Sequence, residues 1–367
     1  AVSGYSSEQI VRLLKLHGEE YDPDLVILYC GNNDASISGA YPDEELLAGQ
    51  KLQSLRGLFS HLALYRLMRS ALTGLKSSAA ADEGELTVRV SPERFGRNLA
   101  EIAAYCRRLD CPLIILKPPT PYLWPAGLQF KPFVHMTGES GQLLLPPAMA
   151  EILGRDLAYC WDEKRFADLY GEGDIFTRQV YRAGFIDSLD PADAVEHCLA
   201  LIRDGHETLP NYNNLGVACW RLGEYDQAAK ALEKAREIFS DQFGKAHNPA
   251  IKAALSPLYF NLGINQLAFQ APDSVNWYDT LGAAFQYLDS ALQADYFSLR
   301  IKSKYLETID DLAGEPGVTI LDLPQLFNQN GSERLFVDHC HPTFTGHRLI
   351  AEEIVRAVQE NGWLKPH

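Results

Sequence analysis

The sequence predicts a mixed α/β protein with a parallel sheet, interrupted by a region that is entirely helical. Three short apolar segments alternate with amphipathic helical segments in the first third of the chain and again near its end. Such alternation is typical of parallel strands joined by right-handed helical crossovers. The middle of the chain carries only helical patterns with recurring small residues. A length of 367 residues agrees with two domains.

The first elements are expected to be a helix and a buried strand. Ser6 with Gln9 three residues later is a capping pattern, and it predicts a helix from Ser6 to Leu16. The nearly continuous apolar run Leu25–Cys30 predicts a strand buried on both faces of the sheet. It ends in the polar turn Gly31–Asp34. Parallel sheets place their chemistry at this carboxyl end of a strand.

The remaining elements of the α/β part follow the same patterns. Ser91-Pro92 starts a helix, and Leu113–Leu116 is expected to be a second buried strand. Near the end of the chain, Val318–Leu321 predicts a third strand. A closing amphipathic helix is indicated by the apolar residues Leu349, Ile350, Ile354 and Val358.

The central region resembles a tetratricopeptide repeat over about 30 residues. Gly216, Tyr225, Ala228 and Ala235 stand where such a repeat needs close helix contact, a filled turn and small packing residues. A second, degenerate copy starts at Asn261-Leu262-Gly263 and resumes at Ala284, Leu288 and Ala291, and a further helix is expected over Asp193–Ile202. Repeats need neighbours to bury their faces, so these helices are expected to lean on the α/β body. The predicted domain bounds are 1–160, 161–297 and 298–367.

The composition is that of a globular protein, with 46% hydrophobic and 22% charged residues. A net charge of −15 argues against nucleic acid or an anionic membrane as the main partner, because both would repel the chain. No apolar run reaches the roughly 18 residues needed to span a bilayer. The seven cysteines contain no Cys-x-x-Cys pair, which argues against a zinc ribbon or a disulfide scaffold.

Two short segments carry N–H donors beside the first predicted helix and after the first predicted strand. Gly4 lies in the segment Val2–Ser7, and a glycine backbone approaches a reacting carbonyl without a side chain in the way. Asn33 lies in the turn after the first strand, and its side-chain amide is a neutral donor of the kind used in oxyanion holes. The alternatives are a plain glycine turn before a helix and an Asn-rich turn that bonds its own backbone.

The segment Val337–Pro342 carries the most specific pattern, Asp-x-x-His-Pro before the closing helix. This spacing on a tight turn brings the Asp338 carboxylate within reach of the His341 imidazole. A solvated loop histidine is one alternative. Another is a metal site formed by Asp338, His339, His341 and His347, although these spacings are not those of a zinc-binding helix.

In this order, the three segments resemble the SGNH (GDSL-like) hydrolase family. The resemblance covers Ala1 to Pro121 and Leu299 to the end, and leaves the helical region outside it as an insertion. It implies a flavodoxin-like three-layer sandwich and no cofactor. It also implies that His341 is the base and Asp338 its orienting carboxylate, with Asn33 and the N–H of Gly4 as oxyanion donors.

The family's nucleophile is a serine in a Gly-Asp-Ser block on a strand that precedes the glycine segment. In this numbering the serine lies upstream of Ala1, and Ser3, Ser6 and Ser7 cannot replace it because they lie in or after the glycine segment. We therefore expect an associated N-terminal segment to carry the nucleophile, and the residues 1–367 alone to be inactive. Without that inner strand, the sheet is expected to expose unpaired strand edges.

The resemblance implies an acyl or acetyl esterase that acts on an acylated carbohydrate or lipid. An O-acyltransferase would use the same residues, and a catalytically inactive body with helices that bind a protein partner is the rival from another class. The segment after Leu116 is expected to overhang the site, where an acyl or sugar pocket would be lined by Tyr122, Leu123, Trp124, Phe130 and Phe133. A proline-stiffened loop packed on the insertion is the alternative.

Overall fold

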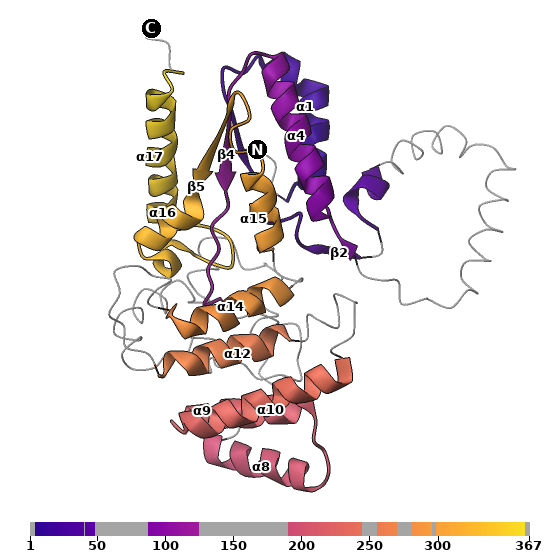
Figure 1. The fold of residues 1–367 in the computed structure, drawn as a ribbon, viewed down its shortest axis with the longest axis vertical. Helices are drawn as coiled ribbons and strands as arrows, with labels where there is room; N and C mark the ends of the chain where they lie inside the picture. Colours follow the sequence, from indigo (N-terminus) through magenta and orange to yellow (C-terminus); the bar gives the residue numbers. More distant parts are fainter. Residues whose placement is uncertain are drawn as a thin grey trace, which may run out of the picture.

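The computed structural model has the mixed α/β architecture that the sequence predicts. A small parallel sheet carries helices on both faces, and a stack of helices lies beyond the end at which β4 (Leu113–Lys117) leaves the sheet (Figure 1). The structure describes residues 4–39, 41–47, 87–124, 190–243, 255–269, 281–295 and 299–363.

The sheet contains β1 (Val26–Tyr29), β4 and β5 (Val318–Asp322) in the order β1-β4-β5, all parallel. Val26 lies opposite Leu113, which lies opposite Val318. All three predicted strands are thereby confirmed, each to within two residues. Because the strands run the same way, the segments that follow β1 and β4 leave the sheet at the same end.

Helices cover the two faces of the sheet and bury alternate strand residues. Leu28, Leu113 and Ile115 face a core formed with α1, α4 and α15, whereas Ile114 and Leu116 face a core formed with α16 and α17 (Figure 1). The bounds are α1 (Ser7–Tyr21), α4 (Pro92–Arg108), α15 (Ser303–Asp310), α16 (Leu323–Gln329), η2 (Ser332–Leu335) and α17 (Phe344–Glu360). A separate antiparallel pair joins β2 (Ile37–Gly39) to β3 (Thr87–Val88).

The predicted capping residues of α1 and α4 take the expected positions. Gln9 Oε1 accepts a hydrogen bond from the N–H of Ser6 at 3.0 Å, and Ser91 Oγ accepts one from the N–H of Arg94 at 3.2 Å. These bonds satisfy backbone donors that a helix start leaves without a partner. The first helix continues five residues beyond the predicted end, to Tyr21.

The prediction that Leu25–Cys30 is buried on both faces was wrong. Leu28 is 4% exposed, but its neighbours Ile27 and Tyr29 are 46% and 40% exposed. Ile27 and Tyr29 point to the other face of β1, and the core beneath α16 and α17 is built on β4 and β5. Within the described ranges no strand pairs with the outer edge of β1. β1 is therefore an edge strand of the described sheet.

The insertion is a stack of helices with its own hydrophobic core. Its helices are α8 (Pro191–Arg203), α9 (Leu209–Arg221), α10 (Tyr225–Phe243), α12 (Ser256–Leu267) and α14 (Ala283–Ala294). The two expected helix pairs form, with Gly216 against Leu232 and Gly263 against Leu288. These helices fall within the predicted bounds 161–297, and residues 161–189 lie outside the described ranges.

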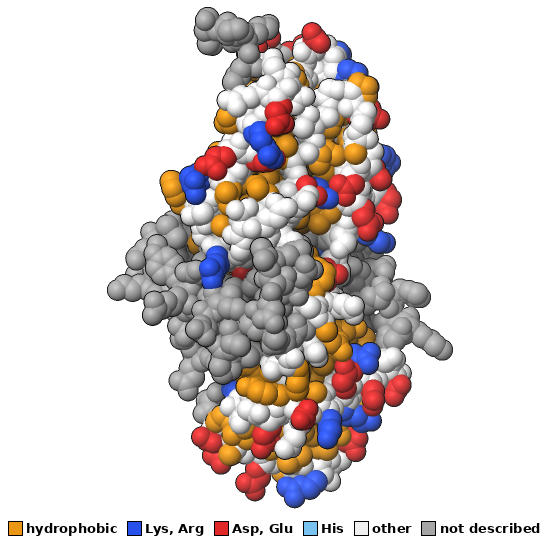
Figure 2. Space-filling view, turned by 60° about the vertical axis from the view of Figure 1, so that its left-hand side comes forward, with side chains coloured by type: hydrophobic (Ala, Val, Ile, Leu, Met, Phe, Trp, Pro, Cys, Tyr) orange, Lys and Arg blue, Asp and Glu red, His pale blue; other side chains and the backbone are white. Residues whose placement is uncertain are grey.

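Acidic and basic side chains alternate over the described surface on the face shown in Figure 2. The net charge of −15 therefore does not gather into one acidic patch on that face. In the part of the chain that the structure describes, no helix combines the length and the apolar character needed to cross a bilayer.

We expect Gly216→Ala to destabilise the insertion, although alanine is the better helix former by about 1 kcal/mol. A Cβ at residue 216 would lie 2.6 Å from Leu232 Cγ and 3.2 Å from the carbonyl oxygen of Ala228. Relieving this overlap is expected to cost about 1–3 kcal/mol of unfolding free energy, measured by urea denaturation. The matched test is the same change in a Leu232→Ala background, where it is expected to cost less. An equal cost in both backgrounds would contradict the close contact.

Candidate active site

The turn after β1 and the segment before α1 are joined by side-chain hydrogen bonds. Asn33 Nδ2 donates to the carbonyl oxygen of Tyr5 at 3.1 Å, and the N–H of Ser7 donates to Asp34 Oδ1 at 2.8 Å. The structure thus brings together the two segments that contain Gly4 and Asn33. Gly4 has a φ of +77° and no heavy atom within 4 Å of a built Cβ, so its backbone is accessible.

An arginine that the sequence analysis did not single out holds the Gly4 segment from the other side. Arg89 Nη1 donates to the carbonyl oxygen of Gly4 at 3.0 Å, and Arg89 Nη2 lies 2.9 Å from Asp43 Oδ2. The same Asp43 oxygen accepts a hydrogen bond from Ser6 Oγ at 2.7 Å. Because Arg89 follows β3, no local pattern in the sequence links it to Gly4.

Ser6 and Ser7 are fully buried, so neither is an accessible nucleophile. The hydroxyl of Ser6 donates a hydrogen bond to Asp43, and the hydroxyl of Ser7 donates one to Asp34. Ser7 Oγ in turn accepts a hydrogen bond from Asn98 Nδ2 at 2.9 Å. Both serines therefore have a structural role in fixing the Gly4 segment. This agrees with the expectation that they do not replace the nucleophile.

Asp34 is a buried carboxyl group with a raised pKa. Burial raises its pKa to about 6, although the hydrogen bonds from Ser7 and the charge of Arg89 act in the opposite direction. Its second oxygen, Oδ2, has no hydrogen-bond partner among the described residues. Asp34 therefore links the two segments. Its ionised form is unfavourable in this buried position.

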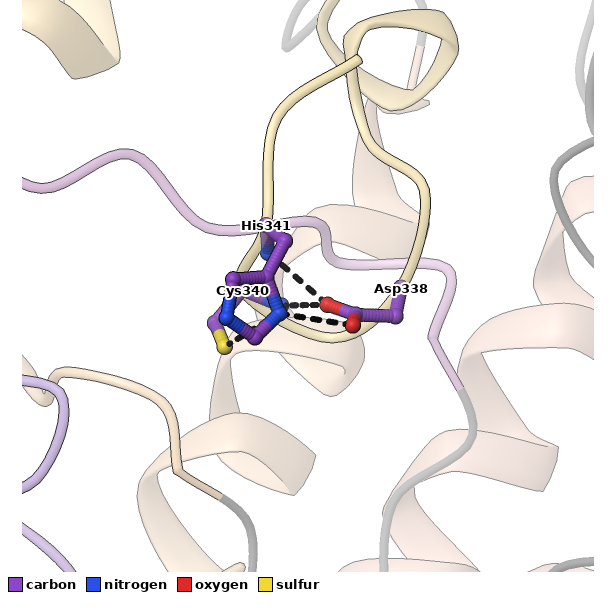
Figure 3. A group of neighbouring side chains, drawn as sticks. All are labelled: Asp338, Cys340 and His341. Carbon is purple, nitrogen blue, oxygen red and sulfur yellow. Dashed lines mark hydrogen bonds and ion pairs between the residues drawn. The ribbon is translucent and has the colours of Figure 1, made fainter. Parts of the chain in front are cut away.

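The loop after η2 brings Asp338 and His341 together, as the sequence predicted (Figure 3). His341 Nδ1 lies 2.7 Å from Asp338 Oδ2, while Asp338 Oδ1 accepts hydrogen bonds from the N–H groups of Cys340 and His341, both at 2.8 Å. A β-bridge between Phe336 and Pro342 closes the loop. Asp338 is 3% exposed at its side chain and His341 is 55% exposed.

The electrostatics of this pair suit proton transfer. Burial alone would raise the pKa of Asp338, but the hydrogen bond from His341 and the neighbouring histidine charges lower it overall. An ionised carboxylate accepts the Nδ1–H of His341, and in that tautomer Nε2 carries the lone pair of an exposed ring. Asp338 is thus placed to orient the imidazole and to stabilise its protonated form.

Tyr29 connects the loop of His341 with the turn of Asn33. The residue is 40% exposed, yet the pKa of its hydroxyl is raised, first by desolvation and then by the nearby Cys340 and Asp338. The same hydroxyl has a hydrogen bond with Asn32. Tyr29 therefore lies near both the loop that carries Asp338 and the turn that carries Asn32 and Asn33.

Among the described residues, one group of three side chains includes two of the residues of the alternative metal site. Ligand atoms of Asp338, Cys340 and His341 lie within 4.8 Å of one another (Figure 3). Burial and the charge of Asp338 raise the pKa of the Cys340 thiol well above 9, so it is protonated at neutral pH. His341 Nδ1 is bonded to the carboxylate, and His347 is exposed on α17. The Asp338 and His341 side chains are therefore hydrogen-bonded to each other, with Cys340 Sγ 3.5 Å from His341 Nδ1.

Of the two possibilities left open for the loop after β4, the structure shows packing on the insertion for Tyr122 and Leu123. Leu123 is fully buried in the core of the insertion, and the ring of Tyr122 packs on Phe285 with ring centroids 4.9 Å apart. The loop is therefore the packed alternative that the sequence analysis left open. Trp124 lies near the site, with its ring centroid 5.8 Å from that of His339. Phe130 and Phe133 lie outside the described residues.

Comparisons of the chain with protein-family models, with curated proteins and with solved structures found no match. The interpretation of the site therefore rests on its geometry and on the sequence motifs that form it.

We predict that Asp34→Asn changes how stability depends on pH. The folded-state pKa of Asp34 is raised to about 6, so its contribution is most favourable at low pH and is lost as the pH rises through that value. From about pH 3.5 to 7.5, the wild type should lose about 3 kcal/mol of unfolding free energy relative to the variant. Urea unfolding over that pH range measures the difference.

The control for this experiment is Asp226→Asn, which removes a carboxylate that is exposed on α10. It should keep the pH dependence of the wild type. A constant difference between wild type and Asp34→Asn at all pH values would contradict the raised pKa.

Proposed function

We propose that the protein is a serine-type carboxylic ester hydrolase with the flavodoxin-like three-layer fold of the SGNH family. The observation that carries the proposal is the 2.7 Å contact between Asp338 Oδ2 and His341 Nδ1, at the end of the sheet that also holds Asn33. A buried, ionised carboxylate behind an exposed imidazole is the arrangement that general-base catalysis requires.

In the proposed mechanism, a serine hydroxyl attacks the acyl carbon of the ester and His341 Nε2 takes its proton. The carbonyl oxygen becomes an oxyanion that accepts hydrogen bonds from the N–H of Gly4 and from Asn33 Nδ2. Asn33 uses one amide hydrogen to hold Tyr5, which leaves the second for this purpose. The imidazolium protonates the leaving alcohol, and water then hydrolyses the acyl-enzyme by the same route.

The proposed carrier of the serine is a strand that pairs in parallel with the outer edge of β1. Support comes from the pairing of β1, which among the described strands has β4 as its partner on one side and no strand on the other. An added strand would satisfy the backbone groups on the outer edge of β1. The end of that strand would lie beside Gly31–Asp34, within reach of both proposed oxyanion donors.

The geometry of the dyad is shared by hydrolysis and acyl transfer, which differ in whether water or a sugar hydroxyl accepts the acyl group. The proposed substrate is an acylated carbohydrate or lipid, and the exposed helices of the insertion are a candidate surface for a protein partner. A catalytically inactive body that only binds a partner would have no need for an activated imidazole.

Labelling of the native, full-length protein with a fluorophosphonate tests the proposed reaction. We expect one serine to be labelled, and we expect the labelling rate to fall by about a thousandfold or more in His341→Ala, because the general base is lost. Mass spectrometry of the labelled peptide identifies the serine, which should lie on the strand paired with β1.

The matched control is His347→Ala, which removes a nearby exposed histidine and should leave the labelling rate unchanged. Equal labelling of the wild type and His341→Ala would contradict the role of His341. Complete absence of labelling, with a folded protein, would instead favour the inactive binding module.

A further inference from the structure

Three consecutive residues, Arg300 to Lys302, each contact a different part of the protein. Arg300 is fully buried, and its Nη1 donates to the carbonyl oxygens of Pro121 at 3.1 Å and Trp124 at 3.3 Å. Its Nη2 donates to Asp295 Oδ2 at 2.9 Å, directly after α14. Arg300 therefore joins the end of the insertion to the loop that follows β4.

Ile301 contacts the turn that holds Asn33. Its N–H donates to Asn32 Oδ1 at 3.0 Å. Gly31 has a φ of +119°, and a Cβ built there would lie 2.5 Å from Ile301 Cδ1. The Ile301 side chain thus occupies the space next to Gly31, and a shift of this segment would move the turn.

Lys302 holds the carboxyl end of α14. Its Nζ donates to the carbonyl oxygens of Leu292 and Asp295, which are among the acceptors that a helix end leaves without an intrahelical partner. Desolvation lowers the pKa of Lys302 to about 7, partly opposed by the charge of Asp295. The last helix of the insertion is therefore fixed to the residues that lead into α15.

The loop held by Arg300 lies against the catalytic loop. The N–H of Tyr122 donates to Glu333 Oε1 at 2.7 Å, just ahead of Asp338 in the chain. The ring of Trp124 packs near His339, which in turn lies next to His341 with ring centroids 6.2 Å apart. A continuous series of contacts therefore runs from Asp295 through Arg300 and this loop to the residues around His341.

We propose that the Asp295–Arg300 ion pair is a positioning device, through which the helical insertion sets the geometry of the Asp338–His341 dyad. The inference rests on the proposed function for its catalytic consequence. It also assigns the insertion a role beyond binding a partner, because a change at α14 would reach the site through Arg300. A buried ion pair is a poor source of stability compared with apolar packing, so a role in fixing one arrangement accounts for it better.

Two variants of the full-length protein test the inference. Arg300→Lys keeps the charge but cannot reach both carbonyl oxygens and Asp295 at once. Asp295→Asn keeps the shape and an acceptor oxygen but removes the charge, and it serves if Arg300→Lys does not fold. The first readout is the NMR signal of the His341 Nδ1–H proton, which reports its hydrogen bond with Asp338 and does not depend on activity.

We expect the Nδ1–H signal to move upfield or to broaden through exchange in both variants. We also expect kcat for ester hydrolysis to fall by between about ten- and a hundredfold, with KM changed less than kcat, because a displaced base impairs the reaction more than binding. The matched control is Leu232→Ala, which loosens the core of the insertion at Gly216 and lies on α10, not on α14. It should lower the melting temperature and leave the signal and kcat unchanged.

An unchanged Nδ1–H signal in both folded variants would overturn the inference. A signal that changes equally in Leu232→Ala would also overturn it, because general loosening would then explain the effect. If the wild type hydrolyses no ester but the signal changes only in Arg300→Lys and Asp295→Asn, the positioning role stands and the proposed function fails.

Discussion

The parallel pairing of β1, β4 and β5 is the constraint on which the rest of the structure depends. Because the strands run the same way, the turn after β1 and the loop after β4 leave the sheet at one end. The candidate site and the contact with the insertion are both built at that end. Among the described residues no strand pairs with the outer edge of β1, and Ile27 and Tyr29 of β1 are exposed whereas Leu113 to Leu116 of β4 are buried.

The two buried carboxyl groups Asp34 and Asp338 have pKa values that are shifted in opposite directions, which suits them to different roles. Asp34 is buried with one bonded oxygen, and desolvation raises its pKa, so it acts as a structural link whose ionisation is unfavourable. Asp338 is buried too, but His341 and backbone N–H groups lower its pKa. A lowered pKa favours the ionised form of Asp338, which is the partner that the proposed base His341 needs.

Much of the fold could be predicted because its signals are local. Apolar runs located the strands, Ser91 marked the start of α4, and the three-residue spacing of Asp338 and His341 predicted their contact. The exposure of Ile27 could not be read from its own segment, because burial depends on which elements lie beside a strand. A continuous apolar run indicates a strand that is suited to burial on both faces, whether or not both faces are covered.

The long-range contacts of Arg300 and Arg89 could not be predicted from the sequence for a different reason. Arg300 bonds a carbonyl oxygen 179 residues away, and Arg89 bonds one 85 residues away. Both acceptors are backbone atoms, which carry no residue-type signal. For Tyr122 and Leu123 the sequence left two alternatives open, because aromatic and apolar residues after a strand suit a substrate pocket and a packed loop equally well.

A crystal structure of the native protein after reaction with a phosphonate ester analogue would test the central claim most directly. The account predicts that phosphorus is bonded to a serine on a strand parallel to β1. One phosphoryl oxygen should lie within hydrogen-bond distance of the Gly4 N–H and Asn33 Nδ2, with His341 Nε2 facing the serine oxygen. An adduct elsewhere, or a β1 edge that remains unpaired in the reacted protein, would contradict it.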